Sequence, residues 1–291
     1  MNKDSFRGVI TPILTPFDAS GALMPGAVGP LVRYQIDHGV QGLFVCGSTG
    51  MGTMMSTDER KKLAETVVRE VDHRVPTIIQ VGTPDTQTAV ELARHAEAAG
   101  ADAVASLPPY YYRHMEESLM LHFQSVARSV SVPMFIYNIP RFAGTNVEPS
   151  LMRRLAEAGI AAGAKDSSND FMQLLKIIEM VPEDFAVING AERYMLPALM
   201  MGARGIIPAL ANAFPELFVG LYKAHEAGDC AKGRELQRRL NRIKDVTDAH
   251  SLSSLYEILK HRGVSCGEPR APFRAATGKE VVRTLRESGE L

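Results

Sequence analysis

The chain has 291 residues, and its 32 Lys and Arg nearly balance its 33 Asp and Glu, which gives a formal net charge of −1. This balance, without a basic block, argues against nucleic acid or an anionic membrane as the main partner. Hydrophobic residues make up 45% of the chain, yet no apolar run approaches the ~18 residues of a membrane span. Residues 1–7 contain no apolar signal core, so we expect a globular, cytoplasmic protein.

The cysteine and histidine content argues against a metalloprotein. The three cysteines, Cys46, Cys230 and Cys266, are too few and too scattered for a disulfide framework or a thiolate metal site. The eight histidines are dispersed and form no metalloprotease motif. We therefore expect reduced thiols and no metal.

Short apolar runs alternate with amphipathic segments along the first two thirds of the chain. They recur at intervals of roughly 20 to 35 residues, which leaves room for a strand, a helix and two loops. Their nearly continuous apolar character is typical of a parallel sheet covered on both faces. The expected strands are Val9 to Leu14, Gly42 to Cys46, Thr77 to Val81, Ala101 to Ser106, Pro133 to Tyr137, Ala161 to Lys165, Phe185 to Asn189 and Gly205 to Ala209.

Eight such units predict an α/β fold, a closed (β/α)8 TIM barrel, with an open doubly wound sheet as the alternative. The run Ser56-Thr57-Asp58-Glu59 has the form of a capping box, and Asp85 or Thr86 can cap the following helix. Helices are expected at Pro215 to His225, Ala231 to His250, Leu252 to His261 and Gly278 to Glu287. We therefore expect the barrel and its active site in residues 1–215, and a C-terminal helical extension packed on it in residues 216–291.

Lys165 ends an apolar segment that should be a buried strand, and barrel active sites lie at the C-terminal ends of strands. Burial disfavours the charged amine and lowers its pKa. The neutral amine can attack a ketone to form an imine, which draws electrons from the adjacent carbon. The alternative is a lysine that only extends to solvent at a strand end.

Two further strand ends carry groups suited to this chemistry. Tyr137 ends another expected strand, and its phenol could donate and accept a proton, although it could equally be an ordinary buried tyrosine. Gly47-Ser48-Thr49-Gly50 follows a strand, and its hydroxyls and backbone N–H groups could bind one carboxylate. A plain tight turn is the alternative for that segment, and a P-loop is excluded because the Gly-Lys-Ser/Thr ending is missing.

Taken together, these segments resemble the dihydrodipicolinate synthase / N-acetylneuraminate lyase family. The resemblance covers about residues 7 to 225, and the helical tail also fits the family. The matching motifs, in family order, are Thr15-Pro16-Phe17, Gly47-Ser48-Thr49-Gly50, Pro109-Tyr110-Tyr111, Tyr137-Asn138-Ile139-Pro140, Gly163-Ala164-Lys165-Asp166-Ser167 and Gly202-Ala203-Arg204-Gly205-Ile206-Ile207.

The resemblance implies a role for each matching residue. Lys165 would form the imine, and Tyr137 would shuttle protons and contact the carboxylate of a keto acid such as pyruvate. Ser48 and Thr49 would hold that carboxylate, with Ser48 also relaying a proton. Tyr111 would complete the relay from a neighbouring subunit of a homotetramer built as a dimer of dimers. The backbone carbonyl of Ile207 would contact the keto acid, and no metal or organic cofactor is implied.

The chain departs from both well-known branches of the family in the second-substrate pocket. Phe142 occupies the position of the arginine with which the synthase branch binds its second carboxylate, and Arg141 lies one residue earlier. Thr57 and Arg60 replace the histidines of the loop that often binds feedback lysine, so lysine inhibition is not expected. Glu192 would partly replace the Asp-Glu pair with which the lyase branch binds substrate hydroxyls.

These features favour a class I aldolase or lyase that joins pyruvate to an aldehyde, or releases it from a 2-keto-3-deoxy sugar acid or a sialic-acid-like substrate. The alternatives are 4-hydroxy-tetrahydrodipicolinate (dihydrodipicolinate) synthase, in which Arg141 would bind the second carboxylate, and a keto-deoxy sugar acid dehydratase that uses the same imine. A non-catalytic sugar-acid binder is the interpretation from another class, and the intact set of Lys165, Tyr137 and Ser48 argues against it.

Overall fold

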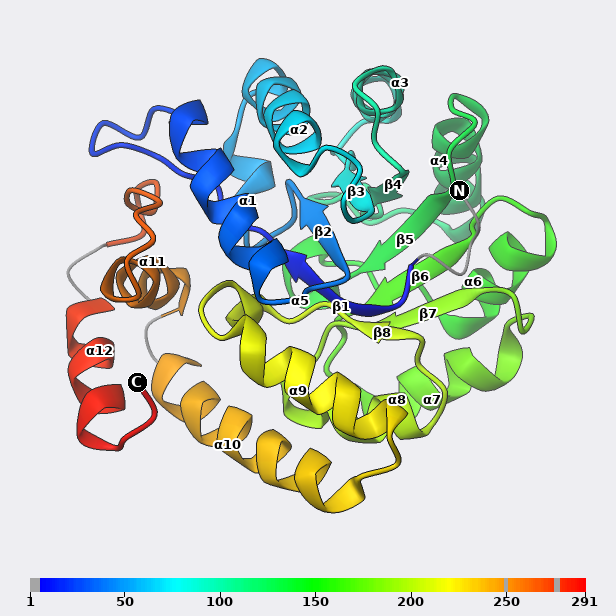
Figure 1. Ribbon diagram of the computed structural model, residues 1–291. Coiled ribbons are helices and arrows are strands. Elements are labelled where there is room, and N and C mark those ends of the chain that lie inside the picture. The colour runs from blue at the N-terminus through cyan, green and yellow to red at the C-terminus, as the bar shows by residue number, and fades with distance from the viewer. Residues whose placement is uncertain (1–5, 249–250, 275–277) are drawn as a thin grey trace.

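A computed structural model describes residues 6–248, 251–274 and 278–291. Eight parallel strands follow one another in chain order around a closed barrel (Figure 1), and β1 pairs with β8 through the register Val9 to Ile206. This closure confirms the predicted TIM barrel and excludes the open sheet. The strands are β1 (Gly8–Pro12), β2 (Gly42–Val45), β3 (Thr77–Gln80), β4 (Ala103–Ser106), β5 (Met134–Asn138), β6 (Gly163–Asp166), β7 (Ala186–Asn189) and β8 (Gly205–Ile206).

The inside of the barrel is filled with side chains, as expected for a barrel of eight strands. Phe6 precedes β1, is 1% exposed and meets Phe135 of β5 edge to face, with ring centroids 5.1 Å apart. Gly163 makes room for Phe135, since a Cβ at this position would lie 2.4 Å from the ring. The other buried hydrophobic members of this inner cluster are Ile10, Phe44, Ile78, Ala103, Ala105, Leu107, Tyr137, Ile139, Ala186, Ile188 and Ile207.

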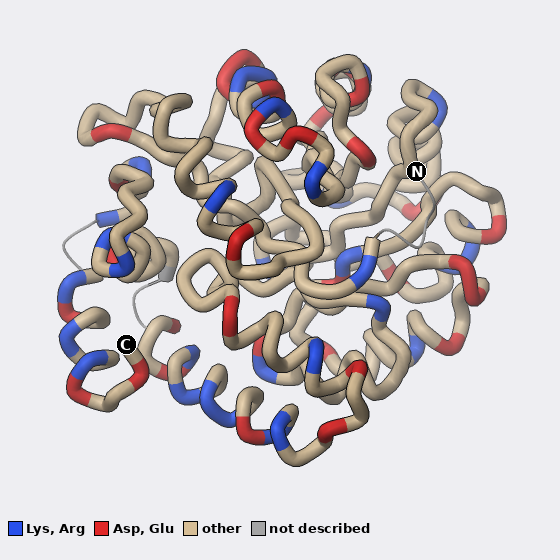
Figure 2. Tube along the Cα trace, viewed as in Figure 1, with Lys and Arg blue, Asp and Glu red and all other residues tan. Residues whose placement is uncertain are grey.

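Helices connect the strands and cover the outside of the barrel, and most charged residues lie on these helices and their connections (Figure 2). They are α1 (Val28–Asp37), α2 (Thr57–Val71), α3 (Thr86–Ala98), α4 (Glu116–Arg128), α5 (Pro140–Ala143), α6 (Pro149–Glu157), α7 (Phe171–Met180), α8 (Met195–Met200) and α9 (Pro215–Glu226), with short 3-10 turns at Pro25–Ala27, Gly52–Met54, Glu192–Tyr194 and Ala209–Asn212.

Local capping explains where two of these helices begin. Ser56 and Glu59 form the predicted capping box at the start of α2. Of the two candidates for the cap of α3, Asp85 is the one that accepts the backbone N–H, from Thr88 at 2.8 Å.

Three C-terminal helices form the extension: α10 (Cys230–Asp248), α11 (Ser251–His261) and α12 (Gly278–Glu287). The expected helix from Ala231 to His250 corresponds to α10, and its last two positions lie outside the described residues. The expected domain boundary after residue 215 falls in the first turn of α9, the helix that follows β8. No helix in the described part of the chain combines the length and hydropathy needed to span a membrane.

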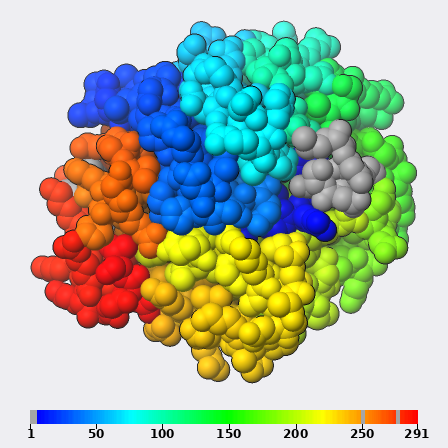
Figure 3. Space-filling view, in the orientation of Figure 1, coloured from blue at the N-terminus to red at the C-terminus, as the bar shows by residue number. Residues whose placement is uncertain are grey.

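The extension is tied to the carboxyl-end side of the barrel by hydrogen bonds. The Tyr256 hydroxyl of α11 donates to the carbonyl of Thr15, which follows β1, at 2.8 Å. Gln237 of α10 donates to the Glu192 carbonyl at 3.0 Å and accepts the Leu196 N–H at 2.9 Å. Figure 3 shows the orange and red C-terminal elements lying against the blue N-terminal segment and the yellow α9 region. The C-terminal helices therefore cover one side of the barrel mouth.

We predict that Phe6→Ala lowers the free energy of unfolding by about 3–5 kcal/mol, since it empties a buried aromatic position with little room to collapse. Thermal or urea unfolding, compared with Phe142→Ala at an exposed aromatic side chain (62% exposed), measures the effect. A loss no larger than that of the exposed control would contradict the proposed packing of the barrel interior.

Candidate active site

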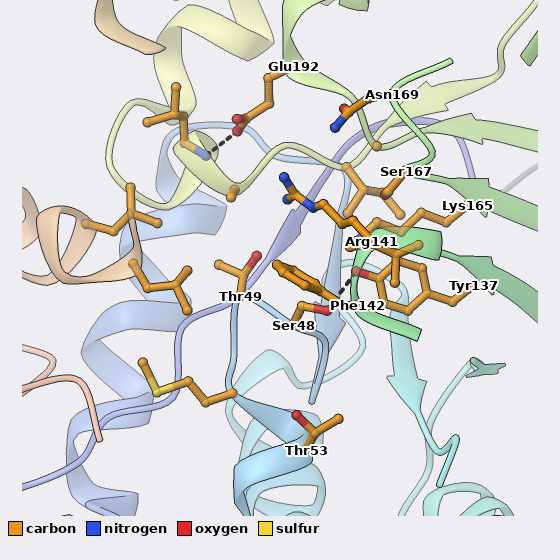
Figure 4. A pocket seen from close by; sticks show the side chains of 18 of the residues that line it. Ser48, Thr49, Thr53, Tyr137, Arg141, Phe142, Lys165, Ser167, Asn169 and Glu192 are labelled. Carbon is orange, nitrogen blue, oxygen red and sulfur yellow. Dashed lines mark hydrogen bonds between the residues drawn. The ribbon is translucent and has the colours of Figure 1, made fainter. Parts of the chain in front are cut away.

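A cavity of about 470 Å³ opens at the carboxyl ends of the strands. Side chains that come from distant parts of the chain converge on it (Figure 4). Among them are Ser48, Thr49, Tyr137, Arg141, Lys165, Glu192 and Ile207, all of which the sequence singled out. The fold therefore gathers these predicted residues, apart from Tyr111, around one cavity.

Lys165 lies in β6 beside Tyr137 of β5, and the parallel register pairs these two residues directly. Its side chain is 4% exposed, and Nζ lies 4.2 Å from the ring centroid of Tyr137 and 4.4 Å from that of Phe44. The ring faces favour a cation, but burial is the larger effect and lowers the pKa of Lys165 to about 7. Near neutral pH a large fraction of this amine is therefore uncharged and nucleophilic.

The phenol of Tyr137 faces the loop after β2. Its hydroxyl lies 3.2 Å from Ser48 Oγ, in a hydrogen bond that either group can donate (Figure 4). Burial raises the pKa of Tyr137 to about 12, although hydrogen bonding to Ser48 and the charge of Arg141 act in the opposite direction. The phenol therefore stays protonated at neutral pH, which suits a group that passes a proton and receives it back.

The loop that carries Ser48 and Thr49 is held by its own backbone. Cys46 and Met51 adopt left-handed conformations on either side of it, with φ of 58° and 54°. The Met51 N–H donates to the Ser48 carbonyl at 3.1 Å, and the Thr15 hydroxyl donates to the Gly50 carbonyl at 2.5 Å. These bonds bend the chain so that the two hydroxyl residues face the cavity, the arrangement expected of a carboxylate pocket.

A polar network on the outer side of the barrel holds β5 and β6 together behind Tyr137 and Lys165. Asp166, which follows Lys165, is 1% exposed and accepts hydrogen bonds from Asn138 at 2.8 Å, Gln173 at 3.1 Å and Ser168 at 2.6 Å. Asn138 follows Tyr137 in the same way, so the Asn138–Asp166 bond joins the two strands next to Tyr137 and Lys165. This bond fixes the relative position of the phenol and the amine.

The outer part of the cavity is lined by charged and apolar groups. Arg141 stacks on Phe142, with its guanidinium carbon 4.6 Å from the ring centroid, and both residues line the cavity. Glu192 is 9% exposed and accepts the backbone N–H of Leu210 at 2.7 Å. Ile207 directly follows β8 and is 2% exposed.

Tyr111 is the one predicted site residue that does not line the cavity within this chain. It has a left-handed backbone, with φ of 82°, and its side chain is 85% exposed. Its neighbour Tyr110 lines the cavity instead. The placement of Tyr111 therefore leaves its phenol available to another molecule.

The C-terminal extension supplies a side of the cavity that the sequence did not suggest. Lys244, Thr247 and Asp248 of α10 line the cavity, as do Leu252, Ser254 and Leu255 of α11, and Phe273. In the sequence, Lys244, Thr247 and Asp248 are spaced so that they share one face of a helix. No local pattern indicated that this face lies over the barrel mouth.

A family model described as "Dihydrodipicolinate synthetase family" matches residues 5–287. The chain belongs to this family. A family member from Acetivibrio thermocellus, named 4-hydroxy-tetrahydrodipicolinate synthase, is 33% identical over 293 residues, which cover 99% of this chain and 99% of that protein. A probable 2-dehydro-3-deoxy-D-pentonate aldolase, YjhH of Escherichia coli, is 37% identical over 245 residues, with 83% of this chain and 81% of that protein covered.

Two solved structures are similar to this chain over nearly its whole length. The prophage protein YagE of Escherichia coli, solved in complex with pyruvate, aligns with a TM-score of 0.93 at 30% identity and covers 98% of this chain and 99% of its own. CdNal of Clostridium difficile, solved in complex with mannosamine, aligns with a TM-score of 0.91 at 27% identity over 96% of this chain and 99% of its own. This family member is therefore an enzyme, a class I pyruvate-dependent lyase or aldolase.

We predict that the rate at which Lys165 forms an imine with pyruvate depends on pH, with a midpoint near the lowered pKa of this lysine. Below about pH 7 the amine is protonated and unreactive, so borohydride trapping of pyruvate should be slow. The trapping rate should rise through pH 7 and level off well below 10.5, the ordinary value of a lysine. A rate that keeps rising to pH 10 would contradict the burial of this amine.

Proposed function

We propose that this enzyme forms an imine between Lys165 and the keto carbon of a 2-keto-3-deoxy sugar acid and releases pyruvate by cleaving a carbon–carbon bond. The observation that supports this most strongly is the buried amine of Lys165 in contact with the Tyr137 ring, at the base of a cavity of about 470 Å³. A non-catalytic binder would have no use for an amine whose pKa burial lowers to about 7.

In the proposed reaction, the neutral amine of Lys165 attacks C2 of the substrate, and water leaves to give the protonated imine. Loss of the proton from the C4 hydroxyl then breaks the C3–C4 bond, with the electron pair drawn into the imine to form an enamine. The aldehyde departs, C3 takes up a proton, and water releases pyruvate from Lys165. Tyr137 lies next to the amine and is our candidate for moving these protons.

We assign the remaining carboxylate-binding and proton-relay roles to neighbouring groups. Ser48 and Thr49 would bind the carboxylate beside the keto carbon, with the Ile207 carbonyl as a further contact. Ser48 would pass protons to and from Tyr137 across their 3.2 Å hydrogen bond. Tyr111 would extend this relay into a neighbouring subunit of a homotetramer, a role supported by its 85% exposure beside a cavity that it does not line. Location in the cytoplasm fits the free cysteines among the described residues.

The outer cavity supports a sugar acid as the substrate. Glu192 offers a carboxylate to substrate hydroxyls, and Phe142 is apolar where the synthase branch would place its arginine. The 37% identity to a probable 2-dehydro-3-deoxy-D-pentonate aldolase also favours this substrate class.

Dihydrodipicolinate synthase activity is the second candidate, and Arg141 is the observation that favours it. Its guanidinium group lines the cavity and could bind the carboxylate of aspartate semialdehyde.

A substrate panel separates these functions. We predict pyruvate release from one or more 2-keto-3-deoxy sugar acids, a borohydride-stable pyruvate adduct on the peptide that contains Lys165, and loss of both in Lys165→Ala without unfolding. Mass analysis of the products distinguishes cleavage from loss of water, which would indicate a dehydratase. The synthase would be favoured instead if the enzyme turned over only pyruvate with aspartate semialdehyde and Arg141→Ala lost this activity.

For Tyr137→Phe we predict a fall in kcat of roughly 10²-fold or more, the usual scale for a general acid–base group. The fold should be retained, because only a hydroxyl is lost. Steady-state kinetics on the substrate identified in the panel provide the measurement. An unchanged kcat would remove this phenol from the proton path.

A further inference from the structure

Lys244 is a charged residue of the cavity that belongs to the extension and not to the barrel. It lies in α10, lines the cavity, and its side chain is 24% exposed. Its Nζ lies 2.6 Å from Glu192 Oε2 and 2.8 Å from Asp248 Oδ1. Burial alone would lower the pKa of Lys244, but Glu192 and Asp248 raise it above its ordinary value, so the ammonium is charged.

A chain of ion pairs holds this ammonium in one place. Asp248 contacts Lys244 on one side and Arg193 on the other, at 2.8 Å in both cases. Arg193 also binds Asp245 of the same helix at 2.7 Å. Glu192 is fixed in turn by the Leu210 N–H. The Lys244–Glu192 pair is therefore pre-organised, so binding a substrate there costs little ordering of side chains.

We propose that Lys244 is a specificity-determining residue that, together with Glu192, binds adjacent hydroxyl groups at the distal end of the substrate. This inference rests on the proposed cleavage of 2-keto-3-deoxy sugar acids. A hydroxyl can donate to the carboxylate while its neighbour accepts from the ammonium, so a diol can use both members of the pair. The inner residues Lys165, Ser48 and Thr49 would meanwhile hold the keto-acid end.

The local charge favours a neutral polyhydroxyl tail over an acidic one. Within the cavity, the carboxylates of Glu192 and Asp248 both pair with Lys244. A second carboxylate or a phosphate placed at Lys244 would be repelled by these two carboxylates at close range, whereas hydroxyl groups would not. The C-terminal extension would thus select the aldehyde half of the substrate.

The test compares two substrates that differ only beyond the cleaved bond. In Lys244→Met, kcat/KM for 2-keto-3-deoxygluconate, which carries hydroxyls at C5 and C6, should fall about tenfold or more, the scale of one lost hydrogen bond to a charged group. For 4-hydroxy-2-ketopentanoate, which has no hydroxyl beyond C4, kcat/KM should stay within about twofold of that of the unchanged enzyme, like the effect of a neutral surface substitution.

Two further variants exclude a merely structural effect. Lys232→Met removes the same charge from α10 at a position where the lysine pairs with exposed Glu235 at 3.0 Å. This control should leave kcat/KM unchanged for both substrates. The double variant Glu192→Gln, Lys244→Met leaves no unpaired buried carboxylate. Its preference for 2-keto-3-deoxygluconate over 4-hydroxy-2-ketopentanoate, measured as the ratio of the two kcat/KM values, should remain as low as in Lys244→Met.

Equal losses on both substrates, no loss on 2-keto-3-deoxygluconate, or recovery in the double variant would each overturn the role of Lys244. If the unchanged enzyme cleaves neither substrate, nor any other 2-keto-3-deoxy acid of the panel, the proposed function fails, and this inference fails with it. If the unchanged enzyme cleaves 2-keto-3-deoxygluconate and Lys244→Met has the same kcat/KM, only this inference is overturned.

Discussion

The burial of one amine inside a closed barrel is the constraint on which the rest of the site depends. The amine of Lys165 lies over the rings of Phe44 and Tyr137, whose faces would stabilise its charge, yet desolvation is the larger effect. Barrel closure provides that desolvation, because no strand edge is open and Phe6 and Phe135 fill the interior from the amino-terminal end. The neutral, nucleophilic form of the amine therefore results from the packing of the whole barrel.

Charge is distributed unevenly along the cavity, and this distribution suits the proposed chemistry. Near Lys165 the polar partners are the hydroxyls of Ser48, Thr49 and Tyr137, which can bind a carboxylate or move a proton without bringing a full charge. Two charged groups of the cavity act on this amine in opposite directions, since Glu192 tends to raise the pKa of Lys165 and Arg141 tends to lower it. Because Glu192 pairs with Lys244, its negative charge is balanced and favours the protonated form of Lys165 less.

In the proposed function, reaction and selectivity would arise from different parts of the chain. Neighbouring strands β5 and β6 hold the amine and the phenol in register, and the Asn138–Asp166 bond joins these strands on their outer side. The outer cavity is formed by the connections after β5 and β7 and by α10 and α11, and none of these belongs to the barrel strands. Such a separation would account for the different activities named for relatives that share this fold.

Local properties of the sequence were enough to predict the eight strands, the caps of α2 and α3, and Lys165 and Tyr137 as strand-end residues. Apolar runs, capping residues and a lysine after an apolar strand are features of neighbouring residues, so they can be recognised without the fold. The position of Lys244 and Asp248 over the barrel mouth depended on the tertiary structure. It follows from how the C-terminal helices, far from the strands in the chain, pack against the barrel, and the local pattern of residues does not encode that packing.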